Sequence, residues 1–179
     1  MLEPQLEDIR LFCTDIDGVW TDGGMYYDGG SAEMKRFNTS DSAGVLLLRL
    51  VGIDTVIATG EDTEIVARRG RKLKLEHVFL GVKDKVATVG ALLERLGLGF
   101  HQIAYIGDDL NDIHLLREAG LSACPANAPD YVAAACDWQL EVAGGDGAYR
   151  AFAERYLRAC GKLDGAVQRY LDGARAFDQ

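Results

Sequence analysis

Short apolar runs alternate along this chain with longer segments in which apolar and polar positions mix. The runs are typical of buried parallel strands and cover residues 9–14, 53–59, 77–80, 102–106, 121–123 and 137–140. The longer segments predict helices over residues 41–51, 63–73, 84–96, 109–118, 129–135 and 148–159. In residues 84–96 the apolar positions follow one face at a period of about 3.6. The order therefore predicts an α/β fold with a doubly wound, mostly parallel sheet.

Two segments depart from this alternation. Residues 25–27 and 33–37 flank Asp28-Gly29-Gly30, where glycine permits the positive φ angles of a tight turn. We therefore expect a β-hairpin flap over about residues 24–38. Residues 161–179 carry the apolar pattern of an amphipathic helix. We expect this extension to pack on the body, residues 1–160, or on a second subunit.

Length and composition restrict the class of protein. The 179 residues amount to about one domain, and 48% of them are hydrophobic, which is enough for a core. No stretch approaches the ~20 apolar residues of a membrane span. The first ten residues carry acids where a secretory signal would be basic, and the four cysteines lack zinc-site spacing. We therefore expect a cytoplasmic protein that acts away from the membrane.

Net charge bears on the partner. Nineteen basic and 28 acidic side chains give a charge of −9, which argues against binding to nucleic acid or to an anionic membrane. A protein this acidic that takes an anionic substrate needs a cation to offset the repulsion.

The acids gather where two predicted strands end. Asp15 and Asp17 follow residues 9–14, and the other group, after residues 102–106, consists of Asp108, Asp109 and Asp112. Ligands of open parallel sheets bind outside the carboxyl ends of the strands, so these carboxylates meet at one edge. They would repel one another unless a cation joined them, and oxygen ligands with room for water suit Mg²⁺.

Each residue at this edge has a chemical role that suits it. Asp15 can attack phosphorus, and Asp17 can protonate the leaving oxygen and then deprotonate water. The transferring phosphoryl oxygens can be held by Thr59, the Gly60 amide and Lys85. Asp108 can ligate Mg²⁺ with Asp112 as its partner. The sequence therefore predicts a metal-dependent phosphoryl-transfer site.

Two other sites with similar residues fit less well. A calcium loop of the EF-hand type needs an oxygen ligand and then glycine where this chain has Val19 and Trp20. A receiver domain of the response-regulator type would carry its phosphoacceptor aspartate after a middle strand, where this chain has Thr59.

Four motifs carry a resemblance to a known family. TDIDGVWTDG (14–23), IATG (57–60), GVKDK (81–85) and YIGDDLND (105–112) resemble the motifs of the haloacid dehalogenase superfamily. The resemblance spans residues 9–158 and implies a Rossmann-like core with Asp15 as nucleophile and Asp17 as acid and base. It also implies Mg²⁺ held by Asp15, the Asp17 carbonyl and Asp108. The residues around the metal would be Asp109, Asn111 and Asp112.

Within that superfamily the chain is similar to the small sugar-acid phosphatases that lack a cap domain. The hairpin, KRFN (35–38) followed by Asp41 and Gly44, and AGGDGAYR (143–150) carry this resemblance. It implies a homotetramer in which the hairpin and neighbouring subunits close the active site.

One position separates two branches of these phosphatases. The branch acting on 3-deoxy-D-manno-octulosonate 8-phosphate usually has arginine after the second motif, where this chain has Glu61. Together with WTDGGMYYD (20–28) and FNTSDSAG (37–44), this resembles the branch acting on 2-keto-3-deoxy-nononate (KDN) 9-phosphate. That branch implies substrate contacts by Asp41 and Glu61, with Arg69 and Lys72 near the sugar-acid carboxylate. Glu61 could instead favour a helix start, and Arg69 and Lys72 could form a solvated helix face.

We therefore expect a Mg²⁺-dependent phosphatase that removes the 9-phosphate of a nine-carbon sugar acid. The octulosonate 8-phosphate is the alternative substrate. A non-catalytic oligomerisation partner of a sugar-acid cytidylyltransferase is the alternative of another class, and it has no need for Asp15, Asp17, Lys85 and Asp108 together.

Overall fold

The computed structural model describes residues 5–30 and 32–177, and its elements follow the predicted order. The strands are β1 (Leu11–Thr14), β2 (Tyr26–Tyr27), β3 (Glu33–Met34), β4 (Asp54–Ala58), β5 (His77–Phe79), β6 (Ile103–Ile106), β7 (Leu121–Cys124) and β8 (Trp138–Gln139). The α-helices are α1 (Asp41–Leu50), α2 (Glu64–Lys72), α3 (Lys85–Leu96), α4 (Ile113–Glu118), α5 (Asp130–Ala133), α6 (Ala148–Ala159) and α7 (Leu163–Phe177). Three single turns of 3₁₀-helix are η1 (Leu6–Asp8), η2 (Phe100–Gln102) and η3 (Leu110–Asp112).

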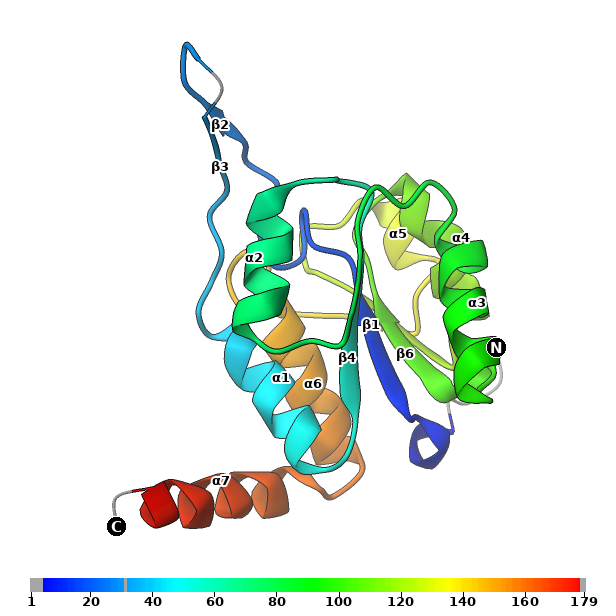
Figure 1. The fold of residues 1–179 in the computed structure, drawn as a ribbon. Helices are drawn as coiled ribbons and strands as arrows, with labels where there is room; N and C mark the ends of the chain where they lie inside the picture. Colours follow the sequence, from blue (N-terminus) through cyan, green and yellow to red (C-terminus); the bar gives the residue numbers. More distant parts are fainter. Residues whose placement is uncertain (1–4, 31, 178–179) are drawn as a thin grey trace.

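Six of the strands form one parallel sheet in the order β5-β4-β1-β6-β7-β8. This confirms the predicted α/β fold. The central strand β1 pairs Thr14 with Ile57 of β4 and with Ile106 of β6. The three strands therefore end level with one another, and the segments that follow them meet at one edge of the sheet (Figure 1).

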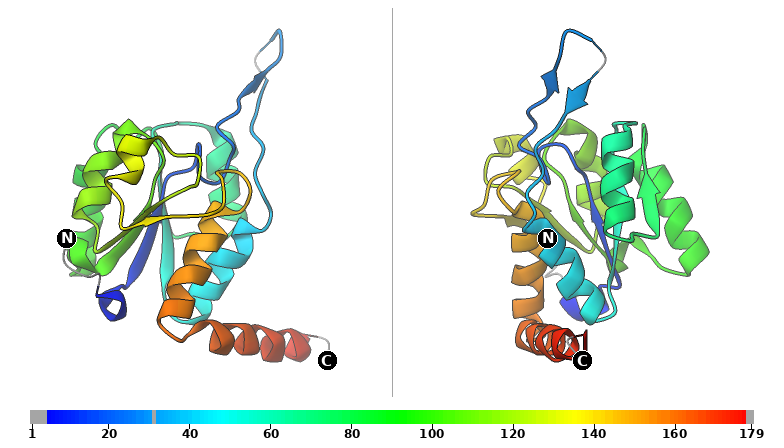
Figure 2. Two further views of the ribbon diagram at one scale, coloured as in Figure 1. Left: turned by 180° about the vertical axis from the view of Figure 1, so that it is seen from behind. Right: turned by 60° about the vertical axis from the view of Figure 1, so that its left-hand side comes forward.

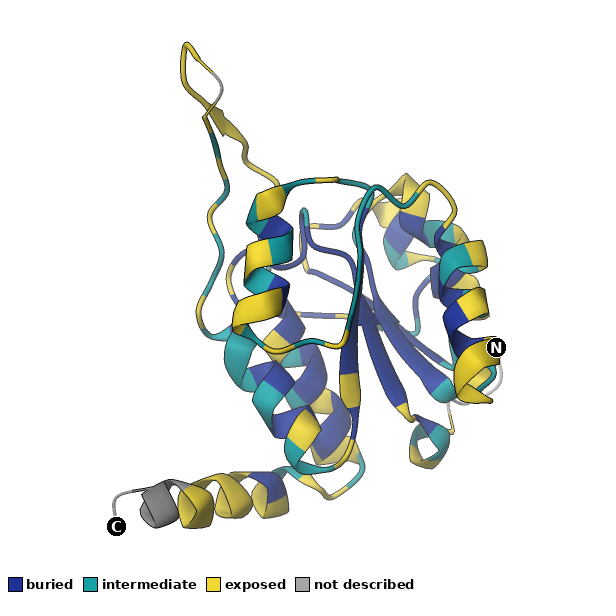
Figure 3. Ribbon diagram, viewed as in Figure 1, coloured by how far each residue is buried: buried dark blue, intermediate teal, exposed yellow. Residues whose placement is uncertain are grey.

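Helices cover both faces of the sheet, and alternate residues of β1 show how the layers form. Phe12 points into a core shared with α1 and α6, while Cys13 points into a core shared with α3, α4 and α5. Figure 3 shows the strands buried between the two helical layers. β1 is buried on both faces, which explains why its sequence is a continuous apolar run.

The helix predicted over residues 109–118 forms in two parts. It begins as η3 and becomes regular only in α4, which starts at Ile113. The reason is that the Asp112 carboxylate accepts hydrogen bonds from the amides of Asp108 and Asp109, which tightens the first turn.

The hairpin and α7 extend from opposite ends of the body (Figure 2). β2 and β3 pair antiparallel, as predicted, and in the described part of the chain the hairpin alone projects beyond the carboxyl edge. α7 buries Ala166 and bonds Arg169 Nη1 to the Leu50 carbonyl at 2.7 Å. Its outer side carries three exposed apolar side chains, Val167, Tyr170 and Leu171.

The division into a domain of residues 1–160 and an extension of residues 161–179 stays a prediction. None of the helices in the described residues has the length and apolar character to cross a membrane.

Candidate active site

A compact turn after β1 sets the position of Asp15. The Asp15 amide continues the sheet by donating to the Ile106 carbonyl at 3.0 Å. The chain then turns sharply, and the amides of Val19, Trp20 and Thr21 all donate to the carbonyl of Ile16. The buried Trp20 ring secures this turn, because its Nε1 donates to Thr14 Oγ1 at 2.9 Å.

Two glycines allow backbone and carboxylate to approach closely. Gly18 has φ +77°, and a Cβ there would lie 1.8 Å from Asp108 Oδ2. A Cβ on Gly144 would lie 1.8 Å from the Gly18 carbonyl oxygen. The segment of residues 143–150 therefore packs against the turn through Gly144, while the missing side chain of Gly18 leaves room for the Asp108 carboxylate.

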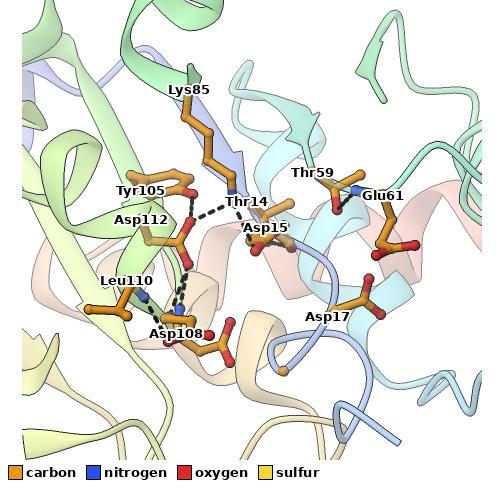
Figure 4. Close-up of polar contacts among 12 residues, drawn as sticks. Thr14, Asp15, Asp17, Thr59, Glu61, Lys85, Tyr105, Asp108, Leu110 and Asp112 are labelled. Carbon is orange, nitrogen blue, oxygen red and sulfur yellow. Dashed lines mark hydrogen bonds and ion pairs between the residues drawn. The ribbon is translucent and has the colours of Figure 1, made fainter. Parts of the chain in front are cut away.

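Lys85, the first residue of α3, lies between two carboxylates (Figure 4). Its Nζ is 2.9 Å from Asp15 Oδ2 and 2.5 Å from Asp112 Oδ1, and the residue is 3% exposed. Burial opposes the charge of Lys85, but the two carboxylates outweigh it and raise the pKa of the ammonium. Lys85 therefore stays charged and fixes the direction of Asp15.

Asp112 is a support for its neighbours. Its Oδ1 accepts from Lys85 and from the Tyr105 hydroxyl, and its Oδ2 accepts from the amides of Asp108 at 2.8 Å and Asp109 at 3.1 Å. A carboxylate has about four lone-pair positions, so these donors fill its capacity. Asp112 orients Lys85 and the Asp108 backbone and has little left to offer a metal.

The remaining carboxylate oxygens fit a divalent cation. One ligand atom each from Asp15, Asp108 and Asp112 lies within 4.8 Å of the others. Asp15 Oδ1 is buried and accepts no hydrogen bond from the described residues. Burial, then the neighbouring carboxylates, raise the pKa of Asp15 to about 6 and that of Asp108 to about 8. The cluster therefore holds more negative charge than Lys85 neutralises, as a metal site without its ion does.

A pocket at the carboxyl edge of the sheet collects most of the predicted site residues. Its lining consists of Asp15, Asp17, Gly18, Gly23, Met25, Thr59, Gly60, Glu61, Asp108, Asp109 and Asn111. Thr59 is 1% exposed, and its amide donates to the Phe79 carbonyl at 3.0 Å, which places it at the end of β4. Lys85 lies immediately behind Asp15. The hairpin contributes Met25, which the sequence pattern did not single out.

Asp17 and Glu61 line the same side of this pocket, away from Lys85 (Figure 4). Asp17 Oδ1 accepts from Thr21 Oγ1 at 3.2 Å, and Asp17 Oδ2 accepts from Lys35 Nζ at 2.8 Å. Sequence reasoning missed Lys35 as a site residue. The KRFN motif that contains it was a family feature with no role attached.

Three residues predicted to contact substrate lie elsewhere, since the described lining includes none of them. Asp41 is completely buried, and its Oδ1 accepts from the Arg150 amide at 3.0 Å, which links α1 to α6. Its contact with substrate stays a prediction. Arg69 Nη2 donates to Ser42 Oγ at 2.8 Å, and the guanidinium carbon Cζ lies 5.8 Å from the centre of the Trp20 ring. Lys72 is exposed at the end of α2. Within this chain, Arg69 contacts α1 and the turn after β1, and the roles of Arg69 and Lys72 toward substrate stay predictions.

The fold and the acidic pocket at the carboxyl edge of its sheet together define a hydrolase. Residues 74–152 match the model of the haloacid dehalogenase-like hydrolases. The chain belongs to this family, and it is a phosphatase.

Phosphatases similar to this chain cover nearly its whole length. The 3-deoxy-D-manno-octulosonate 8-phosphate phosphatase of Haemophilus influenzae is 36% identical over 99% of this chain and 100% of its own length. A structure of the Moraxella catarrhalis enzyme of that name, in complex with magnesium, phosphate and KDO, has a TM-score of 0.88 and 33% identity over 92% of this chain and 95% of its own. A probable YrbI-family phosphatase from Pseudomonas syringae has a TM-score of 0.89 and 41% identity over 93% and 94%.

Proposed function

We propose that this chain hydrolyses the phosphate monoester of a 3-deoxy-2-keto sugar acid through a phosphorylated Asp15, with bound Mg²⁺. The observation that carries the proposal is the environment of Asp15. One of its oxygens is fixed by Lys85, and the other is buried without a partner among the described residues, beside Asp108. A carboxylate held this way at the floor of a polar pocket is prepared to bind metal and attack phosphorus.

The side chains divide the reaction into two displacements. Asp15 attacks phosphorus while Asp17 gives a proton to the leaving sugar oxygen, so that an aspartyl-phosphate forms and a neutral alcohol departs. Asp17 then takes a proton from water, which attacks the phosphorus and returns Asp15 as a carboxylate. Thr59, the Gly60 amide and Lys85 are the donors on this chain that can stabilise charge on the phosphoryl oxygens.

Asp15, Asp108 and the Asp17 carbonyl are the groups proposed to hold Mg²⁺, with Asp109, Asn111 and Asp112 around them. When bound, the ion neutralises charge on the phosphate and orients it for in-line attack.

The octulosonate 8-phosphate is the substrate that the relatives support, because full-length relatives carry that name. This reverses the order that the sequence suggested, in which the KDN 9-phosphate came first. One observation keeps the nine-carbon acid as a second candidate. Glu61 lines the pocket beside Asp17, where the resemblance leads us to expect arginine in the eight-carbon branch.

The test compares kcat/KM for the two phosphates at saturating Mg²⁺, with and without EDTA. We expect hydrolysis of both in Mg²⁺, faster for the octulosonate, and none in EDTA. A Glu61→Arg variant should widen the preference for the eight-carbon acid if Glu61 supports binding of the longer one. A reversed preference in the wild type would return the nine-carbon acid to first place.

The non-catalytic alternative is tested by the same experiment. Magnesium-dependent phosphate release above about 1 s⁻¹, the low end of ordinary turnover, is incompatible with a pure oligomerisation partner. Failure of both sugar-acid phosphates to react would defeat the proposed function.

A further inference from the structure

The hairpin places one charged side chain, that of Lys35, at the active site. Lys35 follows β3 directly, and its side chain has no exposed surface. Its Nζ lies 2.8 Å from Asp17 Oδ2 and 3.9 Å from both Glu61 Oε2 and Glu33 Oε1. One ammonium from the hairpin therefore lies next to two carboxylates of the pocket wall.

A buried ammonium is costly unless it is paired, so Lys35 is poorly explained as packing. Asp17, Glu33 and Glu61 would repel one another without it. Within the described residues Lys35 donates a hydrogen bond to Asp17 alone, although an ammonium has three N–H groups. Lys35 thus offsets the charge of three acids while it aligns one of them.

Asp17 is aligned from two directions. Thr21, on the turn after β1, donates to Oδ1, and Lys35, on the hairpin, donates to Oδ2. The turn is fixed by buried contacts, whereas the hairpin is largely exposed (Figure 3). The orientation of the Asp17 carboxylate therefore depends on where the hairpin lies.

We propose that Lys35 is a positioning residue for the reaction, which holds Asp17 in line with the leaving oxygen and so couples the seating of the hairpin to proton donation. This inference rests on the proposed function, because it takes Asp17 as the proton donor. It adds that the hairpin of the same chain takes part in the chemical step.

The test uses leaving groups that differ in their need for a proton. Wild type, Lys35→Met and Lys35→Arg are assayed on a series of substituted phenyl phosphates, which have no sugar-acid part, and kcat/KM is plotted against the pKa of the phenol. General-acid assistance is worth about 10²–10⁴-fold and matters most for poor leaving groups. We expect Lys35→Met to lose at least about tenfold on the poorest leaving group and far less on the best, which makes the slope steeper. Lys35→Arg should recover part of the wild-type slope.

The matched control is Arg36→Met, which removes the next cation on the hairpin. Arg36 pairs with Asp22 at 3.0 Å and Asp146 at 3.2 Å, outside the pocket lining, and should keep the wild-type slope. Thermal melting establishes that each variant is folded. A Lys35→Met line that is unchanged, or that falls parallel to the wild type, would overturn the proposal. Either result leaves the proposed function intact, because that function is judged on the sugar-acid phosphates with the wild-type protein.

Discussion

Asp15 has two oxygens in different environments, and this difference defines its part in the site. Oδ2 is neutralised by Lys85, while Oδ1 faces the space between Asp15 and Asp108 with no donor from the described residues. An asparagine can keep its oxygen toward Lys85 and turn its amide toward that space, so the substitution preserves the shape and removes the nucleophile.

We therefore predict that Asp15→Asn folds normally and has no measurable turnover, a loss of at least about 10⁴-fold. Its melting temperature in EDTA should equal or exceed that of the wild type, because the replaced carboxylate has a raised pKa of about 6. Phosphate release and thermal melting check the two statements. An active Asp15→Asn protein would exclude the aspartyl-phosphate route.

Asp108 gives a pH dependence whose sign can be worked out. Burial, Asp15 and Asp112 raise its pKa from 3.8 to about 8, so the folded, metal-free protein retains a proton that the unfolded chain loses. The free energy of unfolding must then fall as pH rises between about 4 and 8, by at most about 1.4 kcal/mol per unit.

In EDTA we predict that the melting temperature falls from pH 5 to pH 8, by roughly 2–4 °C for each kcal/mol lost. Asp108→Asn should reduce this fall, and Mg²⁺ should oppose it by binding the folded state. The control is Asp54→Asn, which removes an exposed carboxylate at the start of β4 and should follow the wild-type curve. A wild-type melting temperature that rises with pH in EDTA would contradict the assignment.

The residue types in the sequence predicted the phosphoryl-transfer residues better than the residues that select the substrate. Asp15, Asp17, Thr59 and Asp108 follow strand ends, and the topology of a parallel sheet brings such residues together. The sequence could not show that Asp41 is buried at the start of α1, because an aspartate there can equally serve as a helix-start residue or as a substrate ligand. It could not assign Lys35 either, because its contact with Asp17 depends on where the hairpin folds back.

At the scale of elements, the turn after β1 is the critical connection. It holds Asp15 and Asp17 and leaves room for Asp108 through Gly18. The hydrophobic pattern predicted the strand before this turn. It did not predict the shape of the turn, which depends on three hydrogen bonds from the amides of residues 19–21 to the Ile16 carbonyl. Most element boundaries agree with the pattern within one or two residues. The exceptions are β3, which ends at Met34 three residues before the expected end, and the helix expected from residue 109, whose first turn the Asp112 carboxylate tightens into η3.

We predict that Gly18→Ala impairs metal binding before it impairs the fold. The new methyl group would meet Asp108 Oδ2, and φ +77° disfavours any residue with a Cβ. Such strain costs about 1–3 kcal/mol. We therefore expect the Mg²⁺ concentration that gives the half-maximal rate to rise at least about tenfold.

The matched control for this prediction is Gly29→Ala at the hairpin tip. A Cβ there meets no atom of the described residues within 4 Å, so magnesium titrations of this variant should match the wild type. Equal magnesium requirements for Gly18→Ala and Gly29→Ala would show that Gly18 does not shape the metal site.

For the whole molecule, the resemblance to capless phosphatases predicts a homotetramer closed by the hairpins. The hairpin exposes apolar side chains that a neighbouring subunit could cover, among them Tyr26, Tyr27 and Met34 at 54%, 68% and 62% exposure. We expect a native mass of four times the 19.5 kDa chain, measured by light scattering.

A Tyr27→Asp, Met34→Asp double variant should give smaller species, because it places charge in the expected contact. A separate Leu171→Asp variant places charge on the exposed side of α7 and tests whether the extension takes part in assembly. A wild-type protein that stays monomeric at assay concentration would contradict the tetramer.

The pairing of Thr14 with Ile106 has a consequence for how such an enzyme can change over time. The separation between Asp15 and Asp108 follows from neighbouring strands about 4.8 Å apart, a spacing that every parallel sheet shares. Sequence drift in the two cores leaves this spacing unaltered as long as the sheet forms. Position 61 and the hairpin residues other than Lys35 are not held by that ladder, so they are free to vary. A lineage built on this chain can therefore acquire new sugar acids while it inherits the phosphate chemistry unchanged.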